Sequence, residues 1–222
     1  MSGAPLTLHA LLDEVDHVIW DWNGTLLDDH EHCVAVLNRM LRAKGLPETD
    51  ASRYRLHFDF PAKSYYERLG FDVGPRAWEE LATLFIETYD EGVDGCSLQP
   101  HAPEVLALLE RDGKTSSVLS AARHATLEPL LERHGIRRFF TEIVGLSDHY
   151  ARGKLDLGVQ WIRARRMTPS RALLIGDTVH DFEVATAMGV RCVLLAAGHH
   201  ARERLEACGC PVVDGLDELV GA

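Results

Sequence analysis

The sequence has no long hydrophobic run and no excess of basic residues. Its 222 residues include 23 Lys and Arg against 34 Asp and Glu, which gives a formal net charge of -11. It has no basic footprint of the kind that binds nucleic acid. Its apolar segments are far shorter than the roughly 20 residues of a membrane span. The sequence therefore predicts a soluble globular protein that binds neither nucleic acid nor a membrane.

A disulfide pattern and a secretion signal are also missing. The five cysteines are odd in number and irregularly spaced, at positions 33, 96, 192, 208 and 210. Such a set indicates reduced thiols rather than a disulfide framework. The N-terminus lacks the basic region and the apolar region of a signal peptide. We therefore expect a cytoplasmic protein.

What the chain does contain is an alternation of strand-like and helix-like segments. Strands are expected at 18–21, 116–119, 172–176, 190–196 and 212–214, with a weaker candidate at 143–144. Helical patterns lie between them at 102–112, 125–134, 155–166, 181–188 and 201–208. This alternation predicts an α/β fold with a doubly wound parallel sheet. In such sheets, function gathers at the carboxyl ends of the strands.

The alternation is interrupted once, after the first strand. Between residues 29 and 96 the sequence shows helical patterns at 32–44, 62–68 and 78–89, punctuated by Gly and Pro, and no strand pattern. We interpret residues 29–96 as a helical domain inserted into a core that comprises residues 1–28 and 97–222.

Three carboxylates follow buried strands. Asp21 begins the stretch DWNGTL, in which Gly24 permits a sharp turn. A carboxylate in that position can attack phosphorus and form an aspartyl-phosphate. Asp177 and Asp181 lie in GDTVHD, and their spacing lets both face one point above the sheet. Because clustered carboxylates repel one another, they indicate a divalent cation, which we expect to be Mg²⁺.

Further polar residues accompany these carboxylates. Ser120 ends the strand TSSVLS, where its hydroxyl and the neighbouring amides suit phosphoryl oxygens. Arg123, just after it, is within reach of a phosphate from the same loop. Lys154 opens a helix in RGKLDLG and would balance the charge of an attacking carboxylate and of the phosphoryl group.

Taken in order, DWNGTL, TSSVLS, RGKLDLG and GDTVHD resemble the four motifs of the haloacid dehalogenase-like hydrolase superfamily over essentially the whole chain. The helical insert resembles the C1-type cap of that superfamily, and phosphoglycolate phosphatase-like members are nearest in size and cap type. The resemblance implies a Rossmann-like core and Mg²⁺-dependent hydrolysis of a small, anionic phosphorylated metabolite.

The resemblance also implies roles for individual residues. Asp21 would be the nucleophile. It would bind Mg²⁺ together with Asp177 and the backbone carbonyl of Asn23, and Asp181 would support the ion. The residues implied to hold the phosphoryl group are Thr25, Ser120, Ala121 and Lys154.

Asn23 departs from the pattern of the family phosphatases, which have a second Asp there. That Asp protonates the leaving oxygen and then activates the attacking water. Asn23 keeps the backbone carbonyl and lacks the titratable group, so metal binding is expected to survive. Acid–base help, typically worth roughly 10²–10⁴-fold, is not available from this side chain.

We favour a phosphatase that uses a good leaving group or another proton carrier. Asp28, Asp29 and His30 are close in sequence to the motif. Asn23→Asp is expected to raise turnover of alkyl phosphates if the missing acid limits the rate. A separate chemical alternative is slow deamidation of Asn23, because the following Gly24 does not hinder cyclisation.

Two alternatives lie outside phosphatase chemistry. Dehalogenase and phosphonatase members of the superfamily also lack Asp at this position. The intact GDTVHD motif argues against a metal-free dehalogenase, and a phosphonatase would need a cap lysine, for which Lys44 and Lys63 are the candidates in the insert. The other alternative is a nearly inactive protein that still binds phosphate and Mg²⁺.

The insert is expected to select the substrate. Its segment 53–66, RYRLHFDFPAKSYY, mixes basic and aromatic residues, and Arg55 and Lys63 are candidates for an anionic group of the substrate. His199 and His200 follow the fifth strand and are expected as surface or loop-packing residues, because adjacent loop residues rarely face one ion.

Overall fold

The computed structural model describes residues 8–146, 153–165 and 167–219. At its centre is a six-stranded sheet with the strand order β5-β4-β1-β6-β7-β8. All of its strand pairs are parallel. The strands are β1 (His17–Trp20), β4 (Thr115–Arg123), β5 (Phe140–Leu146), β6 (Ala172–Gly176), β7 (Arg191–Leu195) and β8 (Val212–Val213).

The central strand β1 lies at the point where the strand order reverses. The chain continues from β1 to β4 on one side of the sheet and later returns to β6 on the other. The register places Trp20, the last residue of β1, level with Val118 of β4 and Ile175 of β6. Loops that leave these three strands therefore begin at one edge, where α/β proteins bind ligands.

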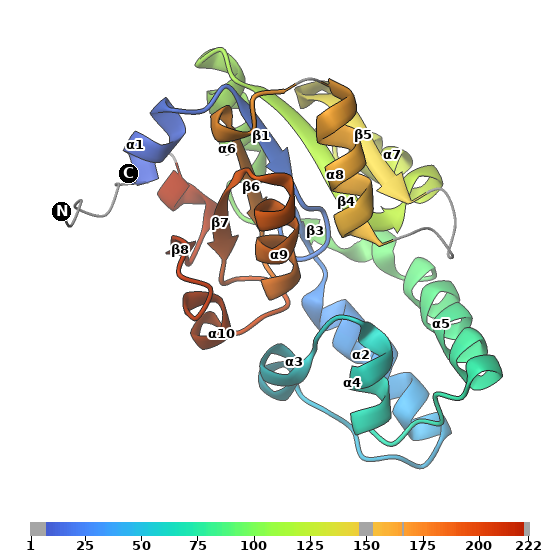
Figure 1. Ribbon diagram of the computed structural model, residues 1–222. Helices are drawn as coiled ribbons and strands as arrows, with labels where there is room; N and C mark the ends of the chain where they lie inside the picture. The colour runs from blue at the N-terminus through green and yellow to red at the C-terminus, as the bar shows by residue number, and fades with distance from the viewer. Residues whose placement is uncertain (1–7, 147–152, 166, 220–222) are drawn as a thin grey trace.

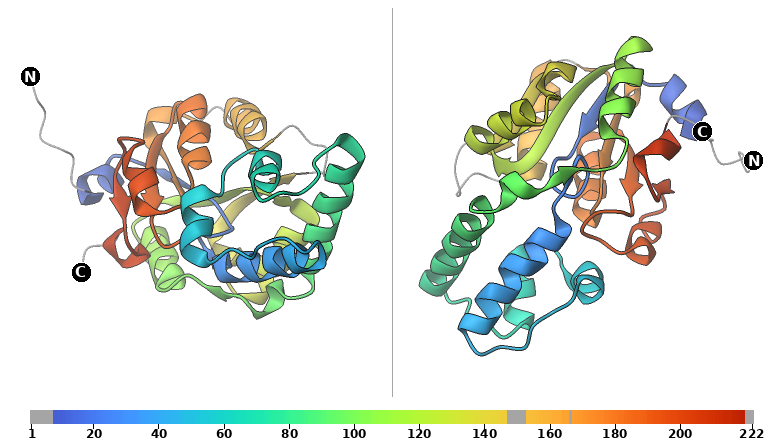
Figure 2. Two further views of the ribbon diagram at one scale, coloured as in Figure 1. Left: turned by 90° about the horizontal axis from the view of Figure 1, so that it is seen from below. Right: turned by 180° about the vertical axis from the view of Figure 1, so that it is seen from behind.

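Helices cover both faces of the sheet (Figures 1 and 2). On one face, α1 (Leu8–Asp13), α6 (Ala102–Arg111) and α7 (His124–Arg133) share a core with Val18 and Trp20 of β1. On the other, α8 (Lys154–Arg165) and α9 (Val179–Met188) pack against Ile19, with α10 (Arg202–Glu206) nearby. This alternation along β1 is the period of two expected for a strand buried on both faces. Within the described residues, 3₁₀ segments lie at Val93–Gly95, Arg137–Phe139, Pro169–Arg171 and Leu216–Leu219.

The helices within residues 30–90 form a separate packed unit beyond the carboxyl edge of the sheet, toward which the strand arrows of Figure 1 point. They are α2 (His30–Ala43), α3 (Ala51–His57), α4 (Ala62–Arg68) and α5 (Pro75–Asp90). They have their own apolar core, to which Leu37, Leu41 and Tyr65 belong. A two-stranded antiparallel ribbon joins the ends of the insert, because β2 (Leu27–Asp28) pairs with β3 (Ser97–Leu98).

The predicted fold class is confirmed, and the differences lie in short elements. The weak candidate at 143–144 is the middle of a full strand, β5. Helix α3 and the β2–β3 ribbon were not predicted. The two-residue strands of the ribbon are too short to carry a periodic pattern. Asp50 was an available signal for α3, since its side chain caps the helix by accepting from the backbone N–H of Arg53 at 2.8 Å.

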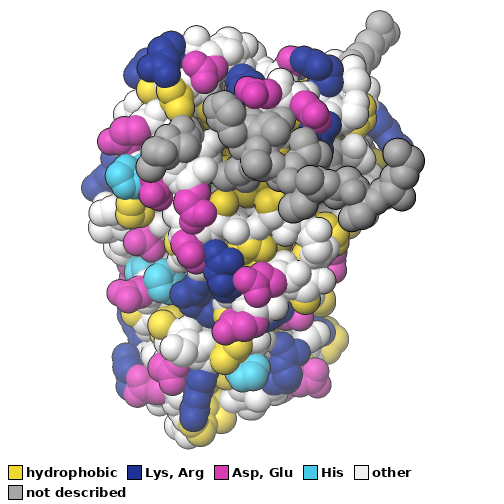
Figure 3. Space-filling model, turned by 90° about the vertical axis from the view of Figure 1, so that its left-hand side faces the viewer, with side chains coloured by type: hydrophobic (Ala, Val, Ile, Leu, Met, Phe, Trp, Pro, Cys, Tyr) yellow, Lys and Arg dark blue, Asp and Glu magenta, His cyan; other side chains and the backbone are white. Residues whose placement is uncertain are grey.

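The surface fits the acidic composition. Figure 3 shows Lys and Arg side chains interspersed with Asp and Glu on one face, without a large basic patch. Among the described helices, none is long and apolar enough to cross a membrane.

Candidate active site

Lys154 joins two carboxylates at the carboxyl edge of the sheet. Asp21 directly follows β1, and Lys154 is the first residue of α8. The Lys154 Nζ atom lies 2.7 Å from Asp21 Oδ1 and also contacts Asp181 Oδ1. All three side chains are buried. Three residues from distant parts of the sequence therefore meet at the carboxyl edge of the sheet, the edge at which the sequence placed them.

Hydrogen bonds from Asp177 and Thr178 fix the orientation of the Asp181 side chain. Asp181 is the third residue of α9, and Thr178 is the N-cap of that helix. Asp181 Oδ2 accepts hydrogen bonds from Thr178 Oγ1 at 2.6 Å and from the Thr178 backbone N–H at 3.0 Å. This capping box holds the Asp181 side chain at the helix N-terminus. The other oxygen is thereby presented to Lys154.

Asp177, at the end of β6, is held by side-chain and backbone donors. Its Oδ1 accepts from Thr25 Oγ1 at 2.9 Å, and its Oδ2 accepts from the His199 backbone N–H at 2.6 Å. Two glycines make room for it, because a Cβ atom at Gly24 or Gly198 would overlap the Asp177 carboxylate. Gly24 also has a positive φ of 74°, which disfavours any side chain there. Thr25, predicted to bind substrate, instead donates to Asp177.

Asp21, Asp177 and Asp181 form a compact acidic cluster. One carboxylate oxygen from each lies within 4.8 Å of the others. Burial raises the pKa of Asp21 to about 7 although Lys154 opposes the shift, and burial raises the pKa of Asp177 to about 6. Burial acts on Asp181 in the same direction, but Lys154 holds its pKa below the usual value. Lys154 therefore compensates the negative charge of Asp181 more fully than the negative charges of Asp21 and Asp177 are compensated.

A second buried network surrounds Asn23. Its Nδ2 donates to Asp29 Oδ2 at 2.7 Å and to the Tyr89 hydroxyl at 2.8 Å. Asp29 is completely buried, and its Oδ1 lies 3.1 Å from His199 Nε2. Burial alone would raise the pKa of Asp29, but His199 and the hydrogen bonds lower it to about 2. Burial would lower the pKa of His199, but Asp29 raises it to about 9, so the two form a buried ion pair.

Asp29, Cys33 and His199 also have potential ligand atoms within 4.8 Å of one another. The Asp29 carboxylate is already occupied by hydrogen bonds, including one from the Gly24 backbone N–H at 2.8 Å and one from Tyr89 at 2.7 Å. The Cys33 thiol lies 3.7 Å from the same carboxylate, and burial raises its pKa well above the usual value. Because a metal needs a thiolate and free carboxylate oxygens, we interpret this group as a hydrogen-bonded network.

The buried charged side chains at this edge do not balance one another. Among the described residues the set comprises Asp21, Asp29, Asp177, Asp181, Lys154 and His199. Four carboxylates face two cationic groups, which leaves two negative charges in a buried site. A divalent cation would compensate both, and the oxygen-only donor set suits a hard ion such as Mg²⁺.

The remaining predicted site residues lie on or near the same edge. Ser120 is completely buried, and its Oγ accepts from the Ala122 backbone N–H at 3.0 Å, beside the exposed Ala121. Arg123 donates to Asp90, the last residue of α5, at 2.9 Å. The guanidinium of Arg123 therefore joins the insert to the core.

The basic candidates of the insert have other surroundings than expected. Arg55 donates to the backbone carbonyls of Ala196 and His200, so it joins α3 to the loop after β7. Lys63 is half-buried on α4, and Lys44 is exposed at the end of α2. The sequence did not predict these surroundings of Arg55 and Lys63, because a sequence pattern does not show which side chains of the insert face the α/β core.

The candidate proton carriers are also separated. Asp28 is exposed and lies 3.3 Å from His30, whereas Asp29 is buried against Asn23. His199 and His200 were expected as surface or loop-packing residues; they are 5% and 0% exposed, so the surface alternative is wrong and both pack inside the protein. The signal for His199 was its position after the fifth strand, at the same edge as the carboxylates.

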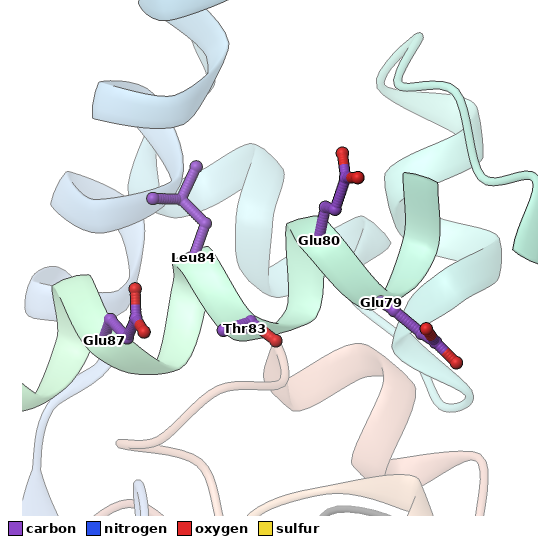
Figure 4. Close-up of a pocket in the computed structure, with 5 residues that line it drawn as sticks. All are labelled: Glu79, Glu80, Thr83, Leu84 and Glu87. Carbon is purple, nitrogen blue, oxygen red and sulfur yellow. The ribbon is translucent and has the colours of Figure 1, made fainter. Parts of the chain in front are cut away.

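A hollow on the insert does not belong to this cluster. It has a volume of about 360 Å³ and is lined by residues of α5 alone. Figure 4 shows them: Glu79, Glu80, Thr83, Leu84 and Glu87. Three of the lining residues carry carboxylates, which would repel an anionic ligand, so this hollow is a poor phosphate site.

A parallel α/β sheet with an acidic, cation-suited site at its carboxyl edge defines a Rossmann-like class of enzyme core. Residues 18–195 match the model of the haloacid dehalogenase-like hydrolase family, and the chain belongs to that family. This finding confirms the resemblance noted in the four motifs.

Curated relatives and solved structures agree with this assignment. Phosphoglycolate phosphatase 1 from Pseudomonas aeruginosa is 27% identical over 212 residues, which cover 91% of this chain and 78% of the relative. N-acetylmuramic acid 6-phosphate phosphatase from the same organism is 28% identical over 210 residues, covering 91% and 92%.

Solved structures share the fold. A haloacid dehalogenase-like family hydrolase from Streptococcus pneumoniae has a TM-score of 0.76 at 20% identity, covering 90% of this chain and 93% of that one. CbbY from Rhodobacter sphaeroides, in complex with phosphate, has a TM-score of 0.68 at 20% identity, covering 93% and 99%.

Gly198→Ala tests the packing around Asp177. The new methyl group would overlap the Asp177 carboxylate, so we expect Mg²⁺ affinity to fall by about tenfold or more. Isothermal titration calorimetry measures the affinity. Gly95→Ala is the matched control, because a Cβ there meets nothing within 4 Å. Equal affinity in Gly198→Ala and the wild type would contradict the assignment of Asp177.

Cation binding is expected to depend on pH. Asp21 and Asp177, with pKa values of about 7 and about 6, must lose their protons to bind a cation, so affinity should rise as the pH rises through this range. Without a cation, folding stability should change in the opposite direction. A carboxyl whose pKa is raised on folding gives stability that is fully present below its usual pKa of 3.8, and that stability is lost as the pH rises from there to about 6 to 7. Titrations in two buffers of different ionisation heat measure the released protons. An affinity that is constant from about pH 5 to pH 8, with no proton release, would contradict these shifts.

Proposed function

We propose that this chain is a Mg²⁺-dependent phosphatase that hydrolyses a small phosphorylated metabolite through an aspartyl-phosphate on Asp21. The observation that carries the proposal is the buried cluster of Asp21, Asp177 and Asp181 with Lys154 at the carboxyl edge of the sheet. The names of the relatives support it, since both Pseudomonas aeruginosa proteins are phosphatases of small phosphorylated metabolites.

The residues present fit a bound Mg²⁺ ion. Asp21, Asp177 and the backbone carbonyl of Asn23 would hold it, and Asp181 would support the site through Lys154. The two uncompensated negative charges of the cluster are the structural reason for a divalent ion. When bound, the ion neutralises the carboxylates and the phosphoryl oxygens, so that an anionic substrate can approach a carboxylate nucleophile.

Asp21 performs the first step of the proposed reaction. One of its Oδ atoms forms a bond to phosphorus while the bond from phosphorus to the ester oxygen breaks, and the electron pair leaves with the alcohol oxygen. Lys154, 2.7 Å from Asp21, favours the ionised nucleophile and balances charge on the transferring group. In the second step water attacks phosphorus, the bond to Asp21 breaks, and inorganic phosphate leaves.

The leaving alcohol oxygen needs a proton, and position 23 cannot supply it. The Asn23 amide is not titratable, and its Nδ2 donates to Asp29 and Tyr89. A substrate whose leaving group is stable as an anion depends least on this proton. Chromogenic aryl phosphates are of this kind, so alkyl phosphates test the physiological reaction better.

We propose that residues 29–96 act as a cap over the core formed by residues 1–28 and 97–222. The contacts between them support this division: the Ala201 backbone N–H donates to the Arg55 carbonyl at 3.0 Å, and Tyr54 OH lies 3.1 Å from His199 Nδ1. A cap docked at the carboxyl edge excludes water and selects the substrate.

We also propose that the protein is cytoplasmic. In that compartment its five free cysteines would stay reduced.

One observation favours a second candidate, a phosphate-binding protein with little turnover. The amide at position 23 leaves the aspartyl-phosphate without the usual base for its hydrolysis. A rapid-quench experiment distinguishes the two candidates. A stoichiometric burst of alcohol without further product indicates a binding protein, and continued release of inorganic phosphate indicates a phosphatase.

The first experiment is a panel of phosphorylated metabolites, assayed with and without Mg²⁺. It should include 2-phosphoglycolate and N-acetylmuramic acid 6-phosphate, the substrates named for two relatives. Release of phosphate from at least one alkyl phosphate, dependent on Mg²⁺, is the expected result.

Asp21→Asn should abolish phosphate release from any substrate of this panel. The amide has nearly the same size but cannot act as the nucleophile, so we expect a loss of roughly 10⁴-fold or more in kcat. Circular dichroism verifies that the variant is folded, and Asp217→Asn provides a charge-matched control at an exposed position of the segment Leu216–Leu219. Unchanged turnover in folded Asp21→Asn would refute the nucleophile assignment.

A further inference from the structure

Asp29 occupies an N-cap position but does not cap its helix. It precedes α2, and its side chain makes no capping hydrogen bond. An Asp at this position usually accepts from the first turn of its own helix. Here the carboxylate is completely buried and turned toward the catalytic loop, where its Oδ2 lies 2.7 Å from Asn23 Nδ2. The Asp29 side chain therefore binds the catalytic loop instead of capping α2.

The donors around Asp29 come from segments that are distant in sequence. Asn23 and Gly24 belong to the loop that follows the nucleophile, and both donate to this carboxylate. Tyr89, near the end of α5 in the insert, donates its hydroxyl at 2.7 Å. His199, in the loop after β7, contacts Asp29 through Nε2 at 3.1 Å. One carboxylate thus fixes the catalytic loop, the insert and the β7 loop together.

The network continues from His199 to both sides of the site. Its Nδ1 lies 3.1 Å from the hydroxyl of Tyr54 on α3 of the insert. Its backbone N–H donates to Asp177, one of the candidate metal ligands, at 2.6 Å. A shift of the Asp29 carboxylate would therefore be transmitted to the cap and to the acidic cluster.

We propose that Asn23 and Asp29 form a matched amide–carboxylate pair, in which Asp29 is a positioning residue for the catalytic loop and for the docked cap. The proposal rests on the proposed function only where turnover is the readout. The pair explains why position 23 holds an amide: Asn23 Nδ2 donates to two oxygens at once, those of Asp29 and Tyr89. It also makes the two positions interdependent.

Asn23→Asp alone would break the pair. A carboxylate has no hydrogen to donate, and it would face the Asp29 carboxylate at hydrogen-bonding distance inside the protein, where like charges repel strongly. This constraint replaces the simple expectation that an acid at position 23 raises turnover. The exchanged pair Asn23→Asp/Asp29→Asn restores one donor and one acceptor, and it leaves the net charge unchanged.

The experiment compares the wild type, both single variants and the exchanged double variant. Unfolding midpoints are measured, together with kcat and KM for 2-phosphoglycolate and 4-nitrophenyl phosphate with Mg²⁺, at a temperature where each protein is folded. Each single variant should lower the midpoint by roughly 10 °C. Each should also lower kcat by roughly a hundredfold, beyond any change in KM, as expected for a displaced catalytic loop. The double variant should recover the part of both losses that comes from the contact between positions 23 and 29, so its losses should be smaller than the sum of the two single losses.

Two further variants make the comparison decisive. Glu31→Gln removes the same charge from an exposed position in the first turn of α2 and should behave as the wild type. Tyr89→Phe removes one donor to Asp29 without creating a charge. If Asp29→Asn does not fold, Tyr89→Phe replaces it as the test of positioning. It should lower kcat about tenfold or more, with a small shift of the midpoint.

Two results would contradict the proposed coupling of Asn23 and Asp29. One is an Asn23→Asp protein as stable and as active as the wild type. Another is a double variant whose losses equal the sum of the two single losses. If the wild type releases no phosphate from any substrate, the phosphatase proposal fails, and the unfolding midpoints still decide whether the pair is coupled.

Discussion

The structure depends on an uneven balance of buried charge at one edge of the sheet. Four carboxylates, Asp21, Asp29, Asp177 and Asp181, are buried there with Lys154 and His199. Each cation neutralises one carboxylate closely: Lys154 pairs with Asp181, and His199 pairs with Asp29. The negative charges of Asp21 and Asp177 are less fully compensated, and burial raises the pKa values of both groups. This buried negative charge is the reason that we propose a bound divalent cation.

Several local features follow from this balance. Glycine at positions 24 and 198 lets the backbone approach the Asp177 carboxylate, where a side chain would overlap it. The capping box of Thr178 and Asp181 turns one Asp181 oxygen toward Lys154. The central position of β1 between β4 and β6 brings the loops together in the first place. Strand order, helix capping and glycine placement therefore serve the same few carboxylates.

The sequence predicted this acidic cluster well and the second network poorly. Asp21, Asp177 and Lys154 could be located because each begins or ends an element, and the ends of parallel strands meet at one edge. The pair of Asp29 and His199 joins residues that are 170 positions apart, beside the contact of Tyr54 of the insert with the β7 loop. Arg55 and Arg123 look like free phosphate ligands in sequence, but they bind partners across the insert–core contact. Local patterns carry no information about such long-range docking.

Asn23 also looks different in the structure. In sequence it is a missing acid, whereas in space it is a donor held by Asp29 and Tyr89. The surroundings of position 23 therefore suit an amide. Which group gives the leaving oxygen its proton is a question separate from the identity of the nucleophile and of the cation.

We propose that Asp21 carries the phosphoryl group during turnover. Acid quenching of the enzyme during steady turnover of an alkyl phosphate with Mg²⁺, followed by mass spectrometry of its peptides, tests this role. We expect a hydroxylamine-sensitive phosphoryl group on Asp21, absent without Mg²⁺. Continued phosphate release with the phosphoryl group on another residue, or with an unmodified protein at every quench time, would contradict it.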